Sequence, residues 1–140
     1  MERKLSATGK CLCGKVEIKA TSISSDLGVC HCDMCRKWGA GPYFALDCGT
    51  DVKINGEEFV SLYDSSDWAQ RGFCKNCGTS LFYKLKEKSH YMLSAEIFND
   101  LDLDFHHQIF IDEKPSYYEF ANNTEKMTGE EVFASFSDEG

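Results

Sequence analysis

The stretch C-H-C-D-M-C-R-K-W-G, residues 30–39, places three cysteines within six positions and a histidine between the first two. A structural zinc site is closed by four ligands in a tetrahedron, so this run is one thiolate short. The missing ligand could be His31, a distant cysteine, or a substrate or water at an open position. The function of the chain depends on which of these applies.

Two other cysteine pairs are separated from this run in the sequence. Cys11 and Cys13 flank one residue, and Cys74 and Cys77 flank two. Each pair offers two thiolates from one turn, so the two pairs together complete a closed tetrahedral site. A C-x-x-C pair can also be a redox dithiol, but such pairs normally open a helix, whereas residues 79–83 look like a strand. The spacing therefore favours one structural zinc site built from these four cysteines.

The middle group then stands alone with Cys30, Cys32 and Cys35. In an extended segment alternate side chains face opposite sides, so a metal held by Cys30 and Cys32 leaves His31 facing away. Three protein ligands and one vacant position are typical of a catalytic zinc site. The alternative is a closed site in which Cys48 is the fourth ligand, although a lone cysteine is more often a small buried hydrophobic residue.

Basic residues gather near the cysteines in an otherwise acidic sequence. Clustered thiolates leave a net negative charge around a divalent metal, which nearby cations can offset. Solvated surface side chains are the alternative for any one of them, and His31, Arg36 and Lys37 are candidates for substrate contact. The basic residues near cysteines are Lys10, Lys15, Arg36, Lys37, Arg71 and Lys75.

Length and charge limit the possible functions. A chain of 140 residues can bury a core as one domain. Its net charge of −8, from 23 acidic and 15 basic residues, disfavours a nucleic-acid partner. No apolar run approaches the roughly 18 residues of a membrane span, and the first residues do not resemble a secretory signal. We therefore expect a cytoplasmic protein whose eight cysteines bind metal rather than form disulfides.

The hydrophobic pattern predicts a mainly β fold. Short alternating or β-branched runs, separated by turn residues, predict strands at 16–20, 23–30, 42–46, 52–54, 58–63, 68–73, 80–85, 91–94 and 107–111. Asn55-Gly56 predicts a hairpin between two of them. Helical turns are expected at 33–38 and at 129–136, the second capped by Thr128. We expect one zinc-binding domain over residues 1–136 and a flexible tail at 137–140.

These motifs resemble the glutathione-dependent formaldehyde-activating enzyme family, whose domain is shared with centromere protein V. The resemblance lies in G-K-C-L-C-G-K-V, C-H-C-D-M-C-R-K-W-G-A-G-P-Y-F, Y-D-S-S, R-G-F-C-K-N-C-G-T-S-L-F-Y and H-Q-I-F-I-D-E-K-P-S-Y-Y-E-F, which follow one another along nearly the whole chain. It implies a single-domain β-tent fold with two zinc ions per chain. The structural zinc would be held by Cys11, Cys13, Cys74 and Cys77, and the catalytic zinc by Cys30, Cys32 and Cys35.

The resemblance also implies an activity. We expect a zinc-dependent carbon–sulfur lyase that forms or cleaves S-hydroxymethyl-type adducts of glutathione, or a similar thiol, with formaldehyde or another small aldehyde. This chain has Tyr117-Tyr118 where the family often shows a tryptophan after the proline. The alternative hypothesis is a non-catalytic, zinc-scaffolded binding module for a protein or thiol ligand.

Overall fold

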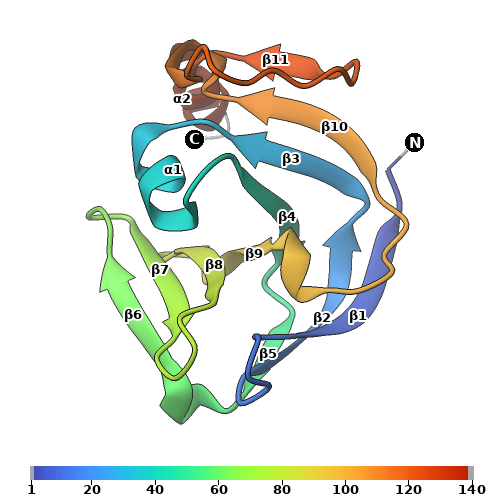
Figure 1. Ribbon diagram of the computed structural model, residues 1–140, viewed down its shortest axis with the longest axis vertical. Helices are drawn as coiled ribbons and strands as arrows, with labels where there is room; N and C mark the ends of the chain where they lie inside the picture. The colour runs from blue at the N-terminus through green and yellow to red at the C-terminus, as the bar shows by residue number, and fades with distance from the viewer. Residues whose placement is uncertain (1, 139–140) are drawn as a thin grey trace.

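The computed structural model describes residues 2–138, which form two β-sheets and a few short helices (Figure 1). The smaller sheet has the antiparallel order β1-β2-β5, with β1 at Lys4–Lys10, β2 at Glu17–Ser24 and β5 at Val52–Asn55. The larger sheet has the order β11-β10-β3-β4-β9-β8-β7-β6. Its strands are β3 (Asp26–Cys30), β4 (Tyr43–Gly49), β6 (Val60–Asp64), β7 (Ala69–Cys74), β8 (Ser80–Leu85), β9 (His90–Ser94), β10 (Asp104–Ile109) and β11 (Glu125–Met127).

The expected mainly β, single-domain fold is confirmed. Figure 1 shows β3, β10 and β11 in the upper part of the molecule and β6 to β8 at the lower left, with helix α1 between them. Within the larger sheet, β10 pairs in parallel with β3 on one side and with β11 on the other. All other strand pairs of the larger sheet are antiparallel. Strand β3, which ends at Cys30, is an interior strand because it pairs with β10 on one side and with β4 on the other.

Helices occupy little of the chain. The α-helices are α1 (Asp33–Gly39) and α2 (Gly129–Asp138), and the short 3₁₀ turns are Glu57–Phe59, Ala95–Ile97 and Ile111–Glu113. The expected cap of α2 is present, because Thr128 Oγ1 accepts from the Glu131 N–H at 3.2 Å and Glu131 Oε1 accepts from the Thr128 N–H at 2.9 Å. Of the expected tail, residues 137 and 138 belong to α2, and 139–140 lie outside the described residues. Within residues 2–138, no helix is long and apolar enough to cross a membrane.

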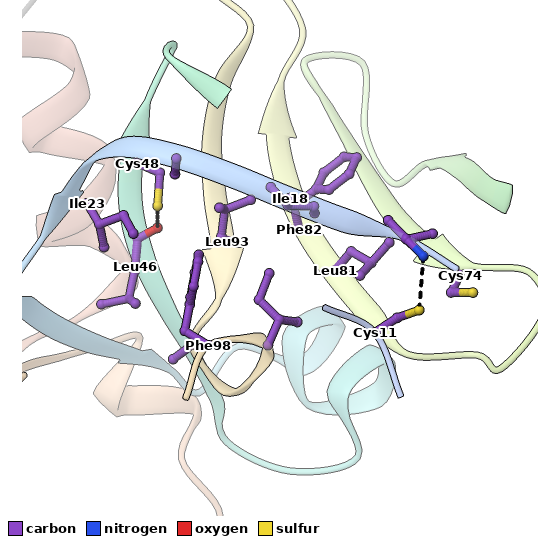
Figure 2. Packing of buried hydrophobic residues seen from close by; sticks show 14 residues of the cluster. Cys11, Ile18, Ile23, Leu46, Cys48, Cys74, Leu81, Phe82, Leu93 and Phe98 are labelled. Atoms are coloured by element: carbon purple, nitrogen blue, oxygen red, sulfur yellow. Dashed lines mark hydrogen bonds between the residues drawn. The ribbon is translucent and has the colours of Figure 1, made fainter. Parts of the chain in front are cut away.

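The core lies where the two sheets face each other. Strand β2 alternates, with Ile18 and Ala20 fully buried and Lys19 exposed, as expected for a strand with one solvated face. Its buried side chains belong to one cluster with Leu46 and Leu93 of the larger sheet (Figure 2). Burying a large aliphatic side chain stabilises a fold by about 1.5–3 kcal/mol, so this contact is what joins the sheets.

Cysteines lie at two places in this core. Figure 2 shows Cys11 and Cys74 beside Leu81 and, beyond the aliphatic side chains, Cys48 beside Leu46. Cys48 is fully buried, its thiol donates to the Leu46 carbonyl at 3.4 Å, and burial raises the pKa of that thiol to about 12. It is therefore a neutral core residue.

The hairpin predicted at Asn55-Gly56 is wrong. Strand β5 pairs with β2 in the smaller sheet, whereas β6 pairs with β7 in the larger one. Gly56 has a φ of 85° and begins a 3₁₀ turn that carries the chain from one sheet to the other. The Asn-Gly pair does mark a left-handed backbone position, but that position serves a crossover between sheets.

The crossover generates a stability prediction. A Cβ added at Gly56 would overlap the Lys15 carbonyl oxygen, in addition to the strain of a positive φ. Gly49→Ala is the matched control, because Gly49 has a φ of 60° and open space around it. We expect Gly49→Ala to cost about 1–2 kcal/mol from left-handed strain, and Gly56→Ala about 1–3 kcal/mol more. Chemical denaturation measures both, and equal losses would show that the close approach to Lys15 is unimportant.

Candidate metal centres

The first centre joins a cysteine pair that follows β1 of the smaller sheet to a pair at the end of β7 in the larger sheet. The Sγ atoms of Cys11, Cys13, Cys74 and Cys77 all lie within 4.8 Å of one another. Cys11 and Cys13 sulfurs are 3.6 Å apart, and those of Cys13 and Cys74 are 3.8 Å apart. Zinc–sulfur bonds of about 2.3 Å in a tetrahedron place the sulfurs about 3.8 Å from each other. The four thiols therefore fit one zinc ion.

Each pair is shaped by a tight turn that ends in glycine. The Gly14 N–H donates to the Cys11 carbonyl at 3.1 Å, and the Gly78 N–H donates to the Cys74 carbonyl at 2.7 Å. Both glycines have a φ near +80°, at 81° and 83°, which residues with a Cβ adopt only with strain. The turn brings both sulfurs of a pair to the same side, and the Val16 N–H donates to Cys11 Sγ at 3.4 Å (Figure 2).

Thr79 ties the two turns together. Its hydroxyl oxygen accepts from the Leu12 N–H of the first turn at 3.1 Å, which leaves its own proton for Cys77 Sγ at 3.2 Å. This hydrogen bond is the main reason that the pKa of the Cys77 thiol is lowered to about 5. One hydroxyl therefore fixes the spacing of the turns and favours a thiolate at Cys77.

The second centre is built at the junction of β3 and α1. Cys30 is the last residue of β3, Cys32 is the N-cap of α1, and Cys35 is its one buried residue. Their three Sγ atoms lie within 4.8 Å of one another. Cys32 Sγ accepts from the Cys35 N–H at 3.3 Å, so the same sulfur caps the helix and belongs to the cluster. The hydrogen bond between Cys30 and Cys32 lowers the pKa of the Cys32 thiol and raises that of the Cys30 thiol.

His31 faces away from the sulfurs and into the protein, as strand alternation predicts. It is fully buried, with Nε2 2.8 Å from Gln108 Oε1 and Nδ1 2.7 Å from the Tyr118 hydroxyl. Burial lowers the pKa of His31, so the ring is neutral. The Gln108 amide nitrogen donates to Thr124 at 2.9 Å, so its oxygen accepts from Nε2–H, and Nδ1 accepts from Tyr118. His31 thus fixes the cysteine run against β10 and the C-terminal segment.

Of the six cations near cysteines in the sequence, Arg71 is the one whose side chain contacts a cysteine sulfur among the described residues. Both its terminal nitrogens lie 3.6 Å from Cys35 Sγ, although Cys74 is much nearer in sequence. Lys10 pairs with Glu17, and Arg36 donates to the His31 carbonyl at 2.8 Å and pairs with Asp33. Lys37 forms an ion pair with Asp33, and the Lys15 ammonium group lies over the Phe59 ring.

A cavity of about 290 Å³ is linked to the three-cysteine centre through one residue, although none of the three cysteines lines it. The connection is Tyr43, which pairs with Cys30 across β3 and β4, packs edge-on against Trp38 of α1, and also lines the cavity. Its hydroxyl is 2.6 Å from Ser94 Oγ. The other lining residues are Gly39, Pro42, Phe44, Ser80, Ser94 and Glu96. The cavity therefore offers hydroxyl groups and one carboxylate, and Tyr43 connects it to the strand that carries Cys30.

Comparison with known proteins places this arrangement in a family. The family model for the glutathione-dependent formaldehyde-activating enzyme matches residues 6–113, which include both cysteine centres. The chain belongs to this family. A Schizosaccharomyces pombe protein described as an uncharacterized lyase is 39% identical over 129 residues, which are 91% of this chain and 94% of the relative. A crystal structure of a Rhodobacter sphaeroides protein is similar with a TM-score of 0.59 and 25% identity, covering 68% of this chain and 90% of that one.

The roles of Thr79 and Tyr118 were not expected from the sequence, and Arg71 was expected to lie near cysteines but not beside Cys35. Thr79 directly follows the C-x-x-C-G turn, and a hydroxyl next to a metal-type turn is the signal that could have found it. Arg71 is a charge within an otherwise buried strand segment, which indicates an internal partner. Tyr118 occupies the stretch where the family often has tryptophan, and its hydroxyl supplies the hydrogen bond to His31. Tyr117 is instead 80% exposed.

The Thr79 contacts predict a measurable stability effect. Thr79→Val keeps the shape of the side chain but leaves the Leu12 N–H and Cys77 Sγ without their partner. We expect the free energy of unfolding to fall by about 1–3 kcal/mol. Thr8→Val, at an exposed position of β1, is the control and should change it by less than about 0.5 kcal/mol. If the two variants melt alike, Thr79 does not hold the turns together.

Proposed function

We propose that this chain is a zinc-dependent carbon–sulfur lyase, which forms or cleaves S-hydroxymethyl-type adducts of glutathione, or a similar thiol, with formaldehyde or another small aldehyde. The observation that carries the proposal is the three-cysteine centre, whose strand neighbour Tyr43 also lines a cavity. Glutathione and formaldehyde come from the family's name, and the lyase class is supported by the description of the S. pombe relative.

Two zinc ions per chain are part of the proposal. Seven of the eight cysteines would be ligands, and Cys48 is instead hydrogen-bonded within the core. At the three-cysteine centre, a bound zinc ion would lower the pKa of an incoming thiol and hold it as a thiolate near neutral pH. The ligands of this catalytic zinc are Cys30, Cys32 and Cys35, and those of the structural zinc are Cys11, Cys13, Cys74 and Cys77.

The reaction needs little else from the protein. In the forward direction the thiolate sulfur attacks the carbonyl carbon, a C–S bond forms, and the C=O π pair moves to oxygen, which takes a proton. The reverse step loses that proton, restores C=O and releases the thiolate, so no oxidant or reductant is required. The hydroxyls of Tyr43 and Ser94 line the cavity and are the groups that we assign to hydrogen-bond the aldehyde oxygen.

The two centres should differ in what their loss does to the fold. Cys77→Ser should unfold or aggregate the protein, because structural zinc contributes on the order of 10 kcal/mol, comparable to the whole stability of a small domain. Cys32→Ser should reduce zinc from two equivalents to one, by elemental analysis, with the fold retained by circular dichroism. Equal loss of folding in both variants, or one zinc equivalent in the fully reloaded wild type, would contradict the assignment of roles.

The activity is tested directly with glutathione and formaldehyde. Zinc-loaded protein should accelerate exchange between free and glutathione-bound formaldehyde above the spontaneous rate, as measured by exchange NMR. Cys32→Ser should return the rate to the spontaneous value, and Cys48→Ser should stay within about two-fold of wild type, since Cys48 lies in the core. A wild-type rate equal to the spontaneous rate would reject this pair of substrates.

A further inference from the structure

Arg71 is a buried cation with an unusual set of neighbours. It lies on β7 with 3% exposure, and its two terminal nitrogens approach Cys35 Sγ at 3.6 Å. The rings of Trp38 and Tyr83 lie 5.3 and 5.1 Å from its guanidinium carbon. Its buried Nε has no hydrogen-bond partner among the described residues. None of the ion pairs found within residues 2–138 includes Arg71.

Such a guanidinium needs an anion nearby. Arginine stays protonated in proteins, and a charge taken out of water without a partner is strongly destabilising. The faces of Trp38 and Tyr83 attract the cation, but an aromatic face supplies only part of what an anion supplies. No carboxylate pairs with Arg71 in the described part of the chain, so Cys35, once it binds a metal ion as a thiolate, would be its counter-ion.

The two centres differ in this respect. At the four-cysteine centre the sulfurs receive hydrogen bonds from neutral groups, the Val16 N–H and the Thr79 hydroxyl. At the three-cysteine centre Cys35 receives two from a full positive charge. Three thiolates around a divalent ion carry one net negative charge, which Arg71 cancels. A fourth ligand that is itself an anion then joins a neutral group instead of a negative one.

We propose that Arg71 is a specificity-determining residue, which makes the three-cysteine centre prefer an anionic sulfur over a neutral ligand at its fourth position. The inference rests on the proposed function, in that it takes this centre as an open metal site. The inference adds a reason why a thiolate binds there. The net negative charge of the three thiolates and the metal ion is already cancelled by Arg71, which contacts Cys35. Arg71 does not need to touch the incoming ligand.

The experiment compares an anionic and a neutral ligand on cobalt-substituted protein. The probes are 2-mercaptoethanol, which binds as thiolate, and imidazole, which binds uncharged. Each is titrated while the visible and charge-transfer bands of cobalt are followed, and the closed four-cysteine centre should stay silent. Arg71→Met should weaken 2-mercaptoethanol binding by about ten-fold or more and imidazole binding by no more than about two-fold.

The control removes a similar cation elsewhere. Lys84 on β8 also lies over an aromatic ring, that of Tyr91 at 5.3 Å, but it has no contact with a cysteine among the described residues. Lys84→Met should leave the ratio of the 2-mercaptoethanol and imidazole affinities unchanged. Arg71→Lys should keep most of the preference for 2-mercaptoethanol, because the positive charge is retained. If Arg71→Met weakens both ligands equally, or neither, Arg71 only packs against the centre and the inference is wrong.

Folding of the variants, read by circular dichroism, gives the remaining outcomes. If Arg71→Met does not fold while Arg71→Lys folds and keeps the wild-type ratio, the requirement for a charge is supported. If Arg71→Lys also fails to fold, the shape of arginine matters more than its charge, and the inference is overturned. A wild-type protein that binds imidazole but no thiol would instead reject the proposed function, since its fourth position would then be open but not used by sulfur.

Discussion

Mutual repulsion between thiolates is the constraint on which the rest of this structure depends. Each centre gathers sulfurs within 4.8 Å of one another, and such groups remain ionised together only where positive charge or hydrogen-bond donors surround them. The two sheets supply these donors in different ways. Tight turns with left-handed glycines aim backbone and hydroxyl groups at one centre, and a buried strand residue, Arg71, delivers a full charge to the other.

The two centres differ in their relation to the hydrophobic core. Cys11 and Cys74 belong to the same buried cluster as the aliphatic residues that join the sheets, so the four-cysteine centre is continuous with the core. The three-cysteine centre instead lies where an interior strand turns into α1, and a fully buried neutral histidine holds its backbone in place. The four-cysteine centre is therefore partly buried in the core, and the three-cysteine centre, where we propose that the chemistry takes place, lies outside that cluster.

Local features were predictable from the sequence, and distant contacts were not. The grouping of the cysteines, the inward direction of His31 and the Thr128 cap follow from spacing over a few residues, and the strand expected at 80–85 matches β8. Strands β1 and β11 have weak patterns and form because of the strands that they pair with. The contacts of His31 with Tyr118 and of Arg71 with Cys35 span 87 and 36 residues, distances at which spacing carries no information.

The same separation in sequence has a consequence for the unfolded chain. Cys13 and Cys74 are 61 residues apart, so a metal ion that joins them closes a long loop, and the unfolded protein rarely brings those ligands together. Cys30, Cys32 and Cys35 lie within six positions and can chelate a metal ion before any sheet exists. An ion that binds both states adds little to stability, whereas one that binds only the folded state adds its full binding free energy. If both centres bind metal as proposed, the short run could take up an ion early in synthesis on the ribosome. The long loop could close only after Cys77 has emerged.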